Sequence, residues 1–576
     1  ASAEALRGEG AEVVVASSAF GVDDQSGEEL VMKVATELGL AVTGGHEITR
    51  LYGLTTRTRT AVINASILPK MILTANMTEA AVREAGIGAP LMIMRGDGGV
   101  MDVREMRRRP VVTMLSGPAA SVAGALMYLR ISDGIYFEVG GTSTNIGVIR
   151  NGRPTVKHAK VGGHETYVNS LDVRVVGIAG GSMVRVRGDQ IVDVGPRSAH
   201  IAGLHYAAFA APGDIVDPKL EMFCPKSGDP DDYVAVRCAS GSRYALTNTC
   251  AANVLGYAKP GWHAHGNAES ARRAFGPLAR QLGKTVEEAA RGVLEKAASK
   301  VTGVVLDLIR EYKLDPDQSV LVGEGGGAAA LIPFVAERMK LDFRISQDAE
   351  VISSIGVALA LVRETVERVM PNPLPEDLQR IKREAFDAAV KIGASPENVE
   401  VTIEVDAQTQ RVRATAIGAT EMRAQDMRKE VGEAEARDIA ASSMGLQADA
   451  VRMVAATDQV RVFQGIVEER KWRIFTTRRA PLRAVDREGV IRIQRSDGLV
   501  TGAMAHEGLD TIRRLWEQAT IYNGDSVIMP DLFVIAGRRV VDLSGVHTLE
   551  QAVAIGRSEF EGLAPDTPVA LISVPG

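Results

Sequence analysis

The sequence predicts an α/β protein, because apolar strand-like runs alternate with helical patterns from the first residues onward. Residues 12–18 are β-branched and apolar, residues 27–38 have helical spacing, and residues 41–43 form a short strand candidate. Further along, two strand candidates run directly into glycine-rich turns, at Gly140-Gly141 and at Gly323 to Gly327. These turns predict places where another molecule can approach the bare backbone closely.

Composition excludes several classes of protein. The chain has 576 residues, of which 45% are hydrophobic and 24% charged, as in ordinary multidomain globular proteins. The formal net charge of −6 gives no electrostatic footprint for nucleic acid, and no apolar run reaches the ~18 residues that a membrane span needs. Three cysteines argue against a disulfide framework. We therefore expect a cytoplasmic protein whose partners include neither nucleic acid nor a membrane.

Before the first glycine turn, the pattern continues to alternate. Residues 61–81 predict a helix interrupted at Pro69, and residues 90–94 predict a buried strand. An alanine-rich helix is expected over residues 119–129.

Residues 135–150, IYFEVGGTSTNIGVIR, predict a phosphate-binding hairpin. Two apolar strands flank Gly140 and Gly141, and paired glycines let successive N–H groups turn toward an anion. Three hydroxyl residues follow, namely Thr142, Ser143 and Thr144. Glu138 stands beside the turn, where a carboxylate can hold Mg²⁺ through water. The alternative is a tight turn whose hydroxyls face solvent.

The hairpin is expected to continue into further strands. Asn151-Gly152 is a type I′ turn signal, and a third strand is expected over residues 154–159.

The second glycine turn lies between a strand over residues 319–322 and a helix over residues 328–339. Its spacing fits a dinucleotide-binding fingerprint, but the acidic residue Asp342 precedes its strand candidate instead of ending it. We therefore expect Gly325 to Gly327 to let an adenine ring or ribose lie against the backbone.

Two other regions are distinct in composition. Residues 198–260 are rich in His, Pro, Gly and Asp and are expected to form an irregular insertion; its histidines and cysteines lack the spacing of a zinc site. A proline-rich boundary near residue 371 precedes an α/β module. Its expected helices cover residues 378–392 and 434–443, and its expected strands cover residues 399–405, 412–417, 459–467, 471–477 and 569–573.

The order of motifs resembles the A-type subunit of the hydantoinase/5-oxoprolinase family, which is related to acetone carboxylase. The resemblance covers residues 11–362 and rests on TRTRTAVINA, PLMIMRGDGGVM, LSGPAASVAGA, EVGGTSTNIGVIRNGRP, SLDVRVVGIAGGSMVRV, VGPRSA and VLVGEGGGAAALIPFVAERM. It implies the two-lobed, ribonuclease H-like core of actin-like ATPases, with ATP between the lobes. The superfamily's first phosphate hairpin has no counterpart here.

The resemblance implies three parts and a set of site residues. Residues 1–134 would be the remainder of the first lobe, residues 135–370 the second lobe with the insertion 198–260, and residues 371–576 a C-terminal α/β domain. The implied cofactors are ATP and Mg²⁺ or Mn²⁺, with Glu138 as the metal residue. The implied catalytic residues are Glu138, Asn145 and Asp172, and the implied cofactor-binding residues are Gly140, Gly141, Thr142, Ser143, Thr144, Gly323, Gly325, Gly326 and Gly327.

This chain departs from the family pattern at several positions. Glu138 and Asn145 stand where the family usually has Asp, and a histidine-containing stretch follows GPRSA. Asp172 with Arg174 reads equally well as an ion pair joining strands.

The resemblance implies an ATP-dependent subunit that activates an amide or ketone substrate by phosphorylation, as in hydantoinases, oxoprolinases or carboxylases. Its implied partners are a large B-type subunit and a separate chain supplying the N-terminal segment. Two alternatives remain, a catalytically silent ATPase-like scaffold and an Hsp70-like reactivating ATPase.

Overall fold

The computed structural model describes residues 2–129, 133–150, 153–315, 319–371, 373–394, 396, 399–406, 410–418, 430–471, 475–523, 526–543, 546 and 548–574. The chain divides into two compact units. Unit 1 comprises residues 1–119, 156–170 and 360–576, and unit 2 comprises residues 120–155 and 171–359. The α/β prediction is confirmed, and the Asn151-Gly152 turn lies outside the described residues.

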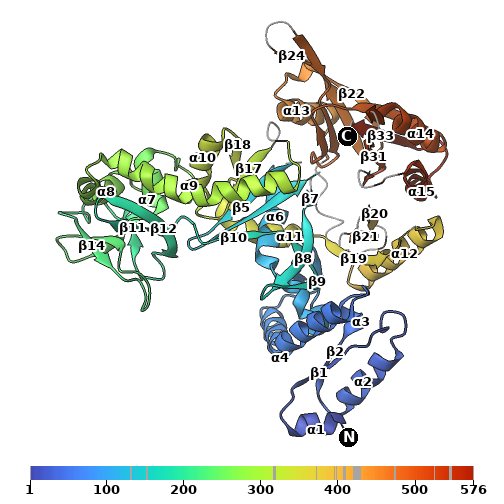
Figure 1. Ribbon diagram of the computed structural model, residues 1–576, viewed down its shortest axis with the longest axis horizontal. Helices are drawn as coiled ribbons and strands as arrows, with labels where there is room; N and C mark the ends of the chain where they lie inside the picture. Colours follow the sequence, from blue (N-terminus) through green and yellow to red (C-terminus); the bar gives the residue numbers. More distant parts are fainter. Residues whose placement is uncertain are drawn as a thin grey trace. The chain divides into compact units, whose positions relative to one another are not determined.

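The central sheet of unit 2 has the strand order β10-β6-β5-β17-β18 (Figure 1). The hairpin β5–β6 and the following β10 are antiparallel, whereas β17 and β18 extend the other side of β5 in parallel. The strands are β5 (Gly134–Val139), β6 (Thr144–Arg150), β7 (Arg153–Pro154), β10 (Arg174–Val176), β17 (Val320–Glu324) and β18 (Asp342–Ile345).

Helices cover this sheet because parallel strands require crossover connections. Helix α9 (Val286–Glu311) packs on β6 and β10, and α10 (Ala328–Met339) packs on β17, β18 and β5 (Figure 1). A capping box at Thr285 and Glu288 begins α9. The other helices are α6 (Ser116–Leu129), α7 (Asn248–Leu255), α8 (Ala268–Leu282) and α11 (Ile352–Leu359), with short 3-10 turns η2 (Ala207–Phe209) and η3 (Ala349–Val351).

Residues 198–260 are not irregular, contrary to the prediction. They contribute to a second sheet of unit 2, with the order β12-β11-β15-β16-β13 and with β14 beside β15. These strands are short, and the turns between them dominate the composition, which explains why the pattern was missed. Their bounds are β11 (Ser182–Arg187), β12 (Gln190–Ser198), β13 (His205–Tyr206), β14 (Lys219–Phe223), β15 (Tyr233–Arg237) and β16 (Arg243–Ala245).

One continuous apolar core joins both sheets of unit 2. Ile135, Phe137 and Ile146 from the central sheet share it with Val234 of the second sheet and Phe275 of α8. This core holds the loops at the ends of β5, β10 and β17 in fixed positions.

Unit 1 begins with a two-stranded parallel sheet flanked by helices. The long helix α4 continues through Pro69, so the predicted interruption does not occur; Ala65 and Leu68 on its buried face keep it packed. The elements are α1 (Ser2–Gly8), β1 (Val13–Ala16), α2 (Ser26–Glu37), β2 (Ala41–Gly44), α3 (Gly45–Ile48), α4 (Leu54–Glu84), α5 (Val103–Arg108) and η1 (Pro110–Thr113).

Residues 360–369, predicted to complete the second lobe, belong to unit 1. Strand β19 (Val362–Val369) pairs with β21 and β4, which shifts the boundary from the predicted residue 370. The five-stranded sheet consists of β20 (Glu400–Asp406), β21 (Arg411–Gly418), β19, β4 (Val100–Asp102) and β3 (Met92–Met94), with α12 (Pro375–Lys391) against it. A hairpin of β8 (Val156–Val161) and β9 (His164–Leu171) also falls largely in unit 1.

The C-terminal part contains two four-stranded sheets. The first is β22 (Val451–Ala456), β23 (Val460–Gly465), β26 (Leu482–Asp486) and β27 (Ile491–Arg495). The second is β28 (Leu499–Met504), β33 (Pro568–Val574), β31 (Asp531–Ala536) and β32 (Arg539–Asp542). The helices of this part are α13 (Glu433–Met444), α14 (Gly508–Ala519) and α15 (Leu549–Phe560), with short 3-10 turns η6 (Ala448–Ala450) and η7 (Ala505–Glu507). Two further strand pairs are β24 (Val467–Lys471) with β25 (Phe475–Arg479) and β29 (Ile521–Asn523) with β30 (Ser526–Ile528).

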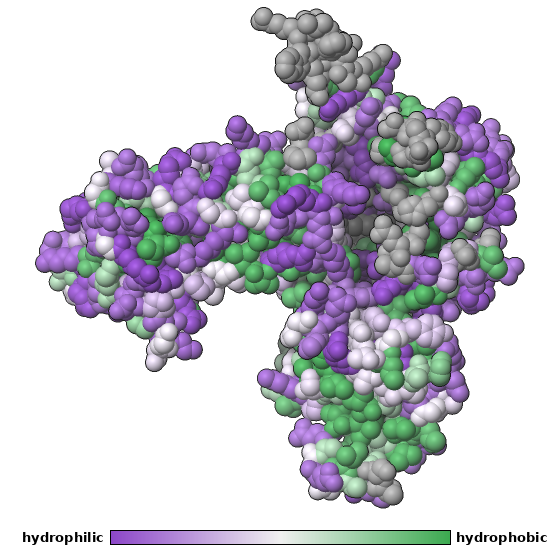
Figure 2. All heavy atoms as spheres, viewed as in Figure 1, coloured by the Kyte–Doolittle hydropathy of each residue, from purple (hydrophilic) through white to green (hydrophobic). Residues whose placement is uncertain are grey.

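Unit 1 carries an exposed apolar surface. Figure 2 shows apolar residues gathered over the part that contains β1, α2 and α4. Exposed Leu30, Val31 and Val34 lie on α2, and exposed Leu73 and Met77 lie on α4. No helix in the described part of the chain is both long enough and apolar enough to cross a bilayer.

The shared core of unit 2 generates a stability prediction. We expect Phe275→Ala to lower the free energy of unfolding by about 3–5 kcal/mol, because Phe275 is fully buried and its removal leaves a cavity. Urea unfolding followed by circular dichroism measures the change. Leu306→Ala on the exposed face of α9 is the control and should change it by less than about 0.5 kcal/mol. Equal effects of the two substitutions would contradict the assigned core.

Candidate functional site

Three glycine turns of unit 2 meet through their backbones. The N–H of Gly180 donates to the carbonyl of Gly140 at 3.2 Å, and the N–H of Gly181 donates to Gly141 at 3.1 Å. The N–H of Gly327 donates to the carbonyl of Val139 at 2.8 Å. The hairpin turn, the loop before β11 and the turn before α10 therefore form one assembly although they are distant in sequence.

Glycine is required at this junction because a side chain would collide with a neighbouring backbone. A Cβ on Gly327 would lie 2.6 Å from the Gly140 oxygen, and one on Gly180 would lie 3.2 Å from the Gly327 Cα. Gly325 has φ +84°, and a Cβ there would lie 2.5 Å from the Val139 oxygen. The second glycine turn is thus shaped partly by contact with the first.

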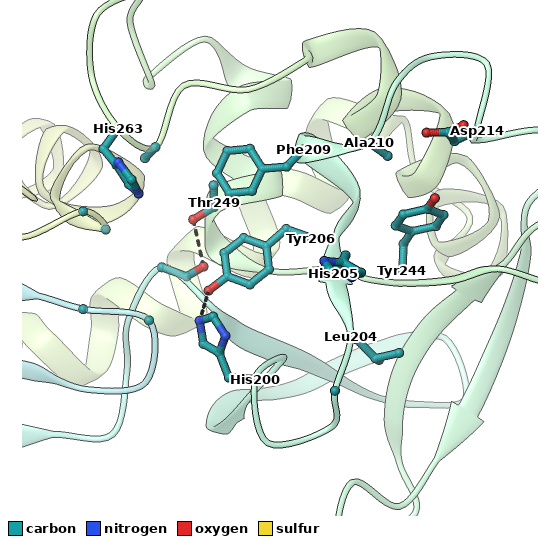
Figure 3. Close-up of a pocket in the computed structure, with 17 residues that line it drawn as sticks. His200, Leu204, His205, Tyr206, Phe209, Ala210, Asp214, Tyr244, Thr249 and His263 are labelled. Atoms are coloured by element: carbon teal, nitrogen blue, oxygen red, sulfur yellow. Dashed lines mark hydrogen bonds between the residues drawn. The ribbon is translucent and has the colours of Figure 1, made fainter.

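A cavity of about 740 Å³ borders all three turns. Figure 3 shows His200, Tyr206 and Thr249 close together, with Asp214 and Tyr244 at the opposite end. The glycines that line it are Gly140, Gly141, Gly180, Gly203, Gly326 and Gly327; the other lining residues are His200, Leu204, His205, Tyr206, Phe209, Ala210, Asp214, Tyr244, Thr249, His263 and Ala264. The volume is in the range of cavities that hold cofactors and drug-sized ligands.

The hairpin turn has amide groups available for an anion. The N–H of Gly140 donates to the carbonyl of Ser143 at 3.1 Å. Within the described residues, the N–H groups of Gly141, Thr142 and Ser143 have no acceptor. The N-terminus of α10 follows Gly327 directly and adds partial positive charge to the same assembly.

The three hydroxyl residues of the hairpin have different surroundings. Thr142 is exposed, and its hydroxyl lies 3.0 Å from that of Ser198. Thr144 is fully buried and donates to the Ile178 carbonyl at 2.5 Å, so it ties the hairpin to the loop before β11.

Glu138 and Asn145 face each other across the hairpin. They are partners in the β5–β6 register, and the Asn145 amide donates to Glu138 Oε2 at 2.9 Å. The Ser121 hydroxyl donates to Glu138 Oε1 at 2.8 Å. Neutral donors thus hold both carboxylate oxygens, and Glu138 is not among the residues that line the cavity. Among the described residues, no group of three His, Cys, Asp or Glu side chains is placed to bind a metal ion.

Asp172 lies in a different polar cluster. It pairs with Arg174 and accepts the Tyr312 hydroxyl at 2.5 Å, while Arg174 also pairs with Glu311 at 2.8 Å. This cluster connects the start of β10 to α9, and none of its members lines the cavity.

The second glycine turn separates into a structural and a cavity-lining half. A Cβ on Gly323 would lie 3.0 Å from Ile332 of α10, so this glycine permits close packing of strand and helix. Gly326 and Gly327 line the cavity. Glu324, which directly follows Gly323, is fully buried, accepts the Ser346 hydroxyl through Oε1, and leaves Oε2 without a hydrogen bond. Burial raises the pKa of Glu324 to about 8.

The sequence did not identify the loop at Gly180 or the aromatic wall as functional. Tyr206 stacks on Phe209 with ring centres 5.5 Å apart, and burial raises the pKa of Tyr206 to about 12. The Thr249 hydroxyl donates to the Gly180 carbonyl at 3.0 Å. The repeat of a Gly-Gly pair after a strand, at Gly180 as at Gly140, is the signal that could have revealed this loop.

Comparison with known proteins places the chain among relatives. Residues 57–366, more than half of the chain, match the family described as Hydantoinase/oxoprolinase. The α subunit of caprolactamase from Pseudomonas jessenii is 26% identical over 350 residues, which cover 59% of this chain and 46% of that protein. An uncharacterized protein of Methanocaldococcus jannaschii is 23% identical over 427 residues, covering 70% of this chain and 59% of that one. The chain thus spans about half the length of these relatives.

A solved structure has the same fold. The crystal structure of ATP-dependent caprolactamase from Pseudomonas jessenii matches with a TM-score of 0.57 at 20% identity, covering 74% of this chain and 67% of that chain.

Because the glycine turns are in contact, we expect a Gly→Ala substitution to change the free energy of unfolding differently at this junction than on an exposed helix. Gly325→Ala should lower the free energy of unfolding by about 2–4 kcal/mol, because it combines a left-handed backbone with a clash against Val139. Gly303→Ala on exposed α9, where nothing lies within 4 Å, should instead raise it by up to about 1 kcal/mol. Chemical denaturation tests the pair; a neutral Gly325→Ala would show that the turns do not depend on their contact.

Glu324 predicts a pH dependence of stability. Its pKa is about 8 in the folded state and about 4.5 in the unfolded state, so the folded state binds more protons between these values and stability falls as pH rises. The free energy of unfolding of the natural protein should therefore fall by about 3 kcal/mol relative to that of the neutral variant Glu324→Gln when the pH is raised from 6 to 9. Denaturation at both pH values measures this difference. The control Glu517→Gln, at an exposed position, should show no such gain. If the stability of Glu324→Gln changed with pH in parallel with that of the natural protein, the raised pKa of Glu324 would be refuted.

Proposed function

The chain belongs to the hydantoinase/oxoprolinase family, and we propose that it is the nucleotide-binding subunit of an ATP-dependent enzyme of this group. Such an enzyme would activate an amide or ketone substrate by phosphorylating its oxygen. The observation that carries the proposal is the shared cavity: the hairpin turn at Gly140-Gly141 and the turn at Gly326-Gly327 border the same 740 Å³ space.

The strand order of unit 2 supports the actin-like part of the proposal. A ribonuclease H-like lobe needs three antiparallel strands continued by two parallel ones, and β10-β6-β5-β17-β18 has this arrangement. The two glycine turns follow β5 and β17, which are adjacent and parallel. Ligands of parallel sheets bind beyond the carboxyl ends of such strands.

The residues that line the cavity, together with Thr142 and Ser143, which follow Gly141 in the hairpin turn, fit a nucleotide. The unpaired amides of Gly141, Thr142 and Ser143 would bind phosphate oxygens, and the N-terminus of α10 would add positive charge. Gly326 and Gly327 would lie against the adenosine. ATP would supply the transferable phosphoryl group, and fixed backbone donors would stabilise the charge that develops during its transfer.

The magnesium ion would be held mainly by the nucleotide and water, as is usual for this ion. Glu138 would reach that ion only through water, because both of its carboxylate oxygens already accept hydrogen bonds from Ser121 and Asn145 and it does not line the cavity. Asp172, bound to Arg174 and Tyr312, would stabilise the connection of β10 and α9 and would influence the site only through that connection.

We also propose that the chain works with partner subunits. The caprolactamase relative is itself an α subunit, and the exposed apolar residues of α2 and α4 offer a surface that another polypeptide would cover. A large B-type subunit is the expected partner.

A second candidate function is a catalytically silent scaffold. The observation that favours it is the engagement of both Glu138 oxygens by neutral donors, together with Asn145 in place of a carboxylate.

Nucleotide binding is tested with a substitution that fills the cavity without straining the fold. Gly140 is exposed, and a Cβ there meets only the Ser143 oxygen at 3.5 Å. We expect isothermal titration to show saturable binding of Mg-ADP to the natural protein and at least about 10-fold weaker binding to Gly140→Leu. The matched control Gly303→Leu on α9 should bind as the natural protein does. If no binding of Mg-ADP to the natural protein were detected, the proposed nucleotide site would be refuted and the scaffold function would be favoured.

Substrate class is decided by turnover of the complex purified with its partners. Release of ADP on addition of hydantoins or 5-oxoproline would support amide activation, and release that needs a ketone with bicarbonate would support carboxylation. Binding of ATP without turnover of any of these would favour the scaffold.

A further inference from the structure

The described residues that line the cavity include no lysine or arginine. They include three histidines, His200, His205 and His263. A nucleotide phosphate carries between one and two negative charges at neutral pH, and protein sites usually provide a cationic side chain for it. Imidazole is the side chain present here that can become cationic near neutral pH.

His200 is the histidine placed at the hairpin turn. A Cβ on Gly141 would lie 2.5 Å from His200 Nε2, so the imidazole ring reaches the bare backbone of the turn. His200 is exposed to the cavity. Any anion that approaches the amides of Gly141 and Thr142 from the cavity would meet this ring.

Tyr206 holds the His200 ring in place. The Tyr206 hydroxyl lies 3.1 Å from His200 Nε2, and the two rings are 5.6 Å apart (Figure 3). Tyr206 is itself stacked on Phe209, so its hydroxyl is a fixed point. His263 lies against Gly326 in a similar way, with a Cβ on Gly326 at 2.7 Å from its ring.

We propose that His200 contacts the phosphate of the bound nucleotide and, when protonated, supplies the positive charge of this end of the cavity. The proposal rests on the proposed nucleotide site and goes beyond it by naming a phosphate-contacting side chain. The histidine-containing stretch after β12 would then replace a fixed lysine or arginine, and phosphate affinity would increase with protonation of His200.

The groups around His200 leave its charge uncompensated in the empty site. Tyr206 remains neutral, because its pKa is about 12, and the hydroxyls of Thr142 and Ser198 bond to each other. His205 is the other titratable group on the element that carries Tyr206. Within the described residues, no Asp or Glu forms an ion pair with His200, so the natural counter-charge is the ligand.

The experiment compares Mg-ADP binding by the natural protein, His200→Gln and His200→Ala at pH 6 and pH 8, using isothermal titration of the full chain. Glutamine keeps a hydrogen-bond donor but cannot become charged. The phosphates of ADP also change their protonation between pH 6 and pH 8, but free ADP does so equally in every titration. The ratio of the natural protein's affinity to the variant's affinity at each pH therefore reports the contribution of His200. His164→Gln, at an exposed position of β9, is the matched control. Thermal unfolding of each variant confirms the fold.

We expect His200→Gln to bind about 10-fold more weakly than the natural protein, with the larger loss at the lower of the two pH values, because glutamine cannot become charged. His200→Ala should bind Mg-ADP at least as weakly as His200→Gln. Tyr206→Phe should show a smaller change of affinity with pH than the natural protein, because the hydroxyl that holds the His200 ring is gone. A constant ratio near one at both pH values, with the natural protein binding ADP, would overturn the role of His200 and leave the nucleotide site intact. Failure of the natural protein to bind ADP at either pH would overturn both.

Discussion

The contact of three glycine turns is the constraint on which the rest of the site depends. Backbone N–H groups of Gly180, Gly181 and Gly327 donate to carbonyls of the β5–β6 hairpin, and no side chain fits between them. Because these contacts use main-chain atoms, they hold the three turns at hydrogen-bonding distance from one another. Part of the cavity wall at this end is therefore backbone, and amides of the hairpin turn stay available to a ligand.

Chemical specificity then has to come from the wall built by residues 198–264. This segment brings the stacked Tyr206 and Phe209, the histidines and Thr249 to the edge of the glycine turns. The glycine turns let a ligand approach the backbone closely, and the segment around the second sheet supplies the side chains that contact it. Charged groups nearby serve the scaffold instead, as Asp172 does with Arg174 and Tyr312. Glu324 stays buried in the strand that leads to the second turn.

Much of the local structure was predictable because its signals are local. The hairpin over residues 135–150 and the helix over residues 328–339 follow from apolar periodicity ended by glycine, and both occur as predicted. The sheet within residues 198–260 was missed because strands of two to five residues give too short an alternation. The roles of Gly180 and Thr249 depend on contacts across tens of residues, which spacing in one sequence does not reveal. The assignment of β19 to unit 1 depends in the same way on its long-range pairing with β21.

The most direct measurement is a crystal structure of the protein with a magnesium complex of a non-hydrolysable ATP analogue. We predict phosphate oxygens within hydrogen-bonding distance of the amides of Gly141, Thr142 and Ser143, and adenosine against Gly326 and Gly327. A nucleotide bound away from these turns, or a structure in which the Gly180–Gly140 and Gly327–Val139 hydrogen bonds are absent and the turns separated, would contradict this prediction.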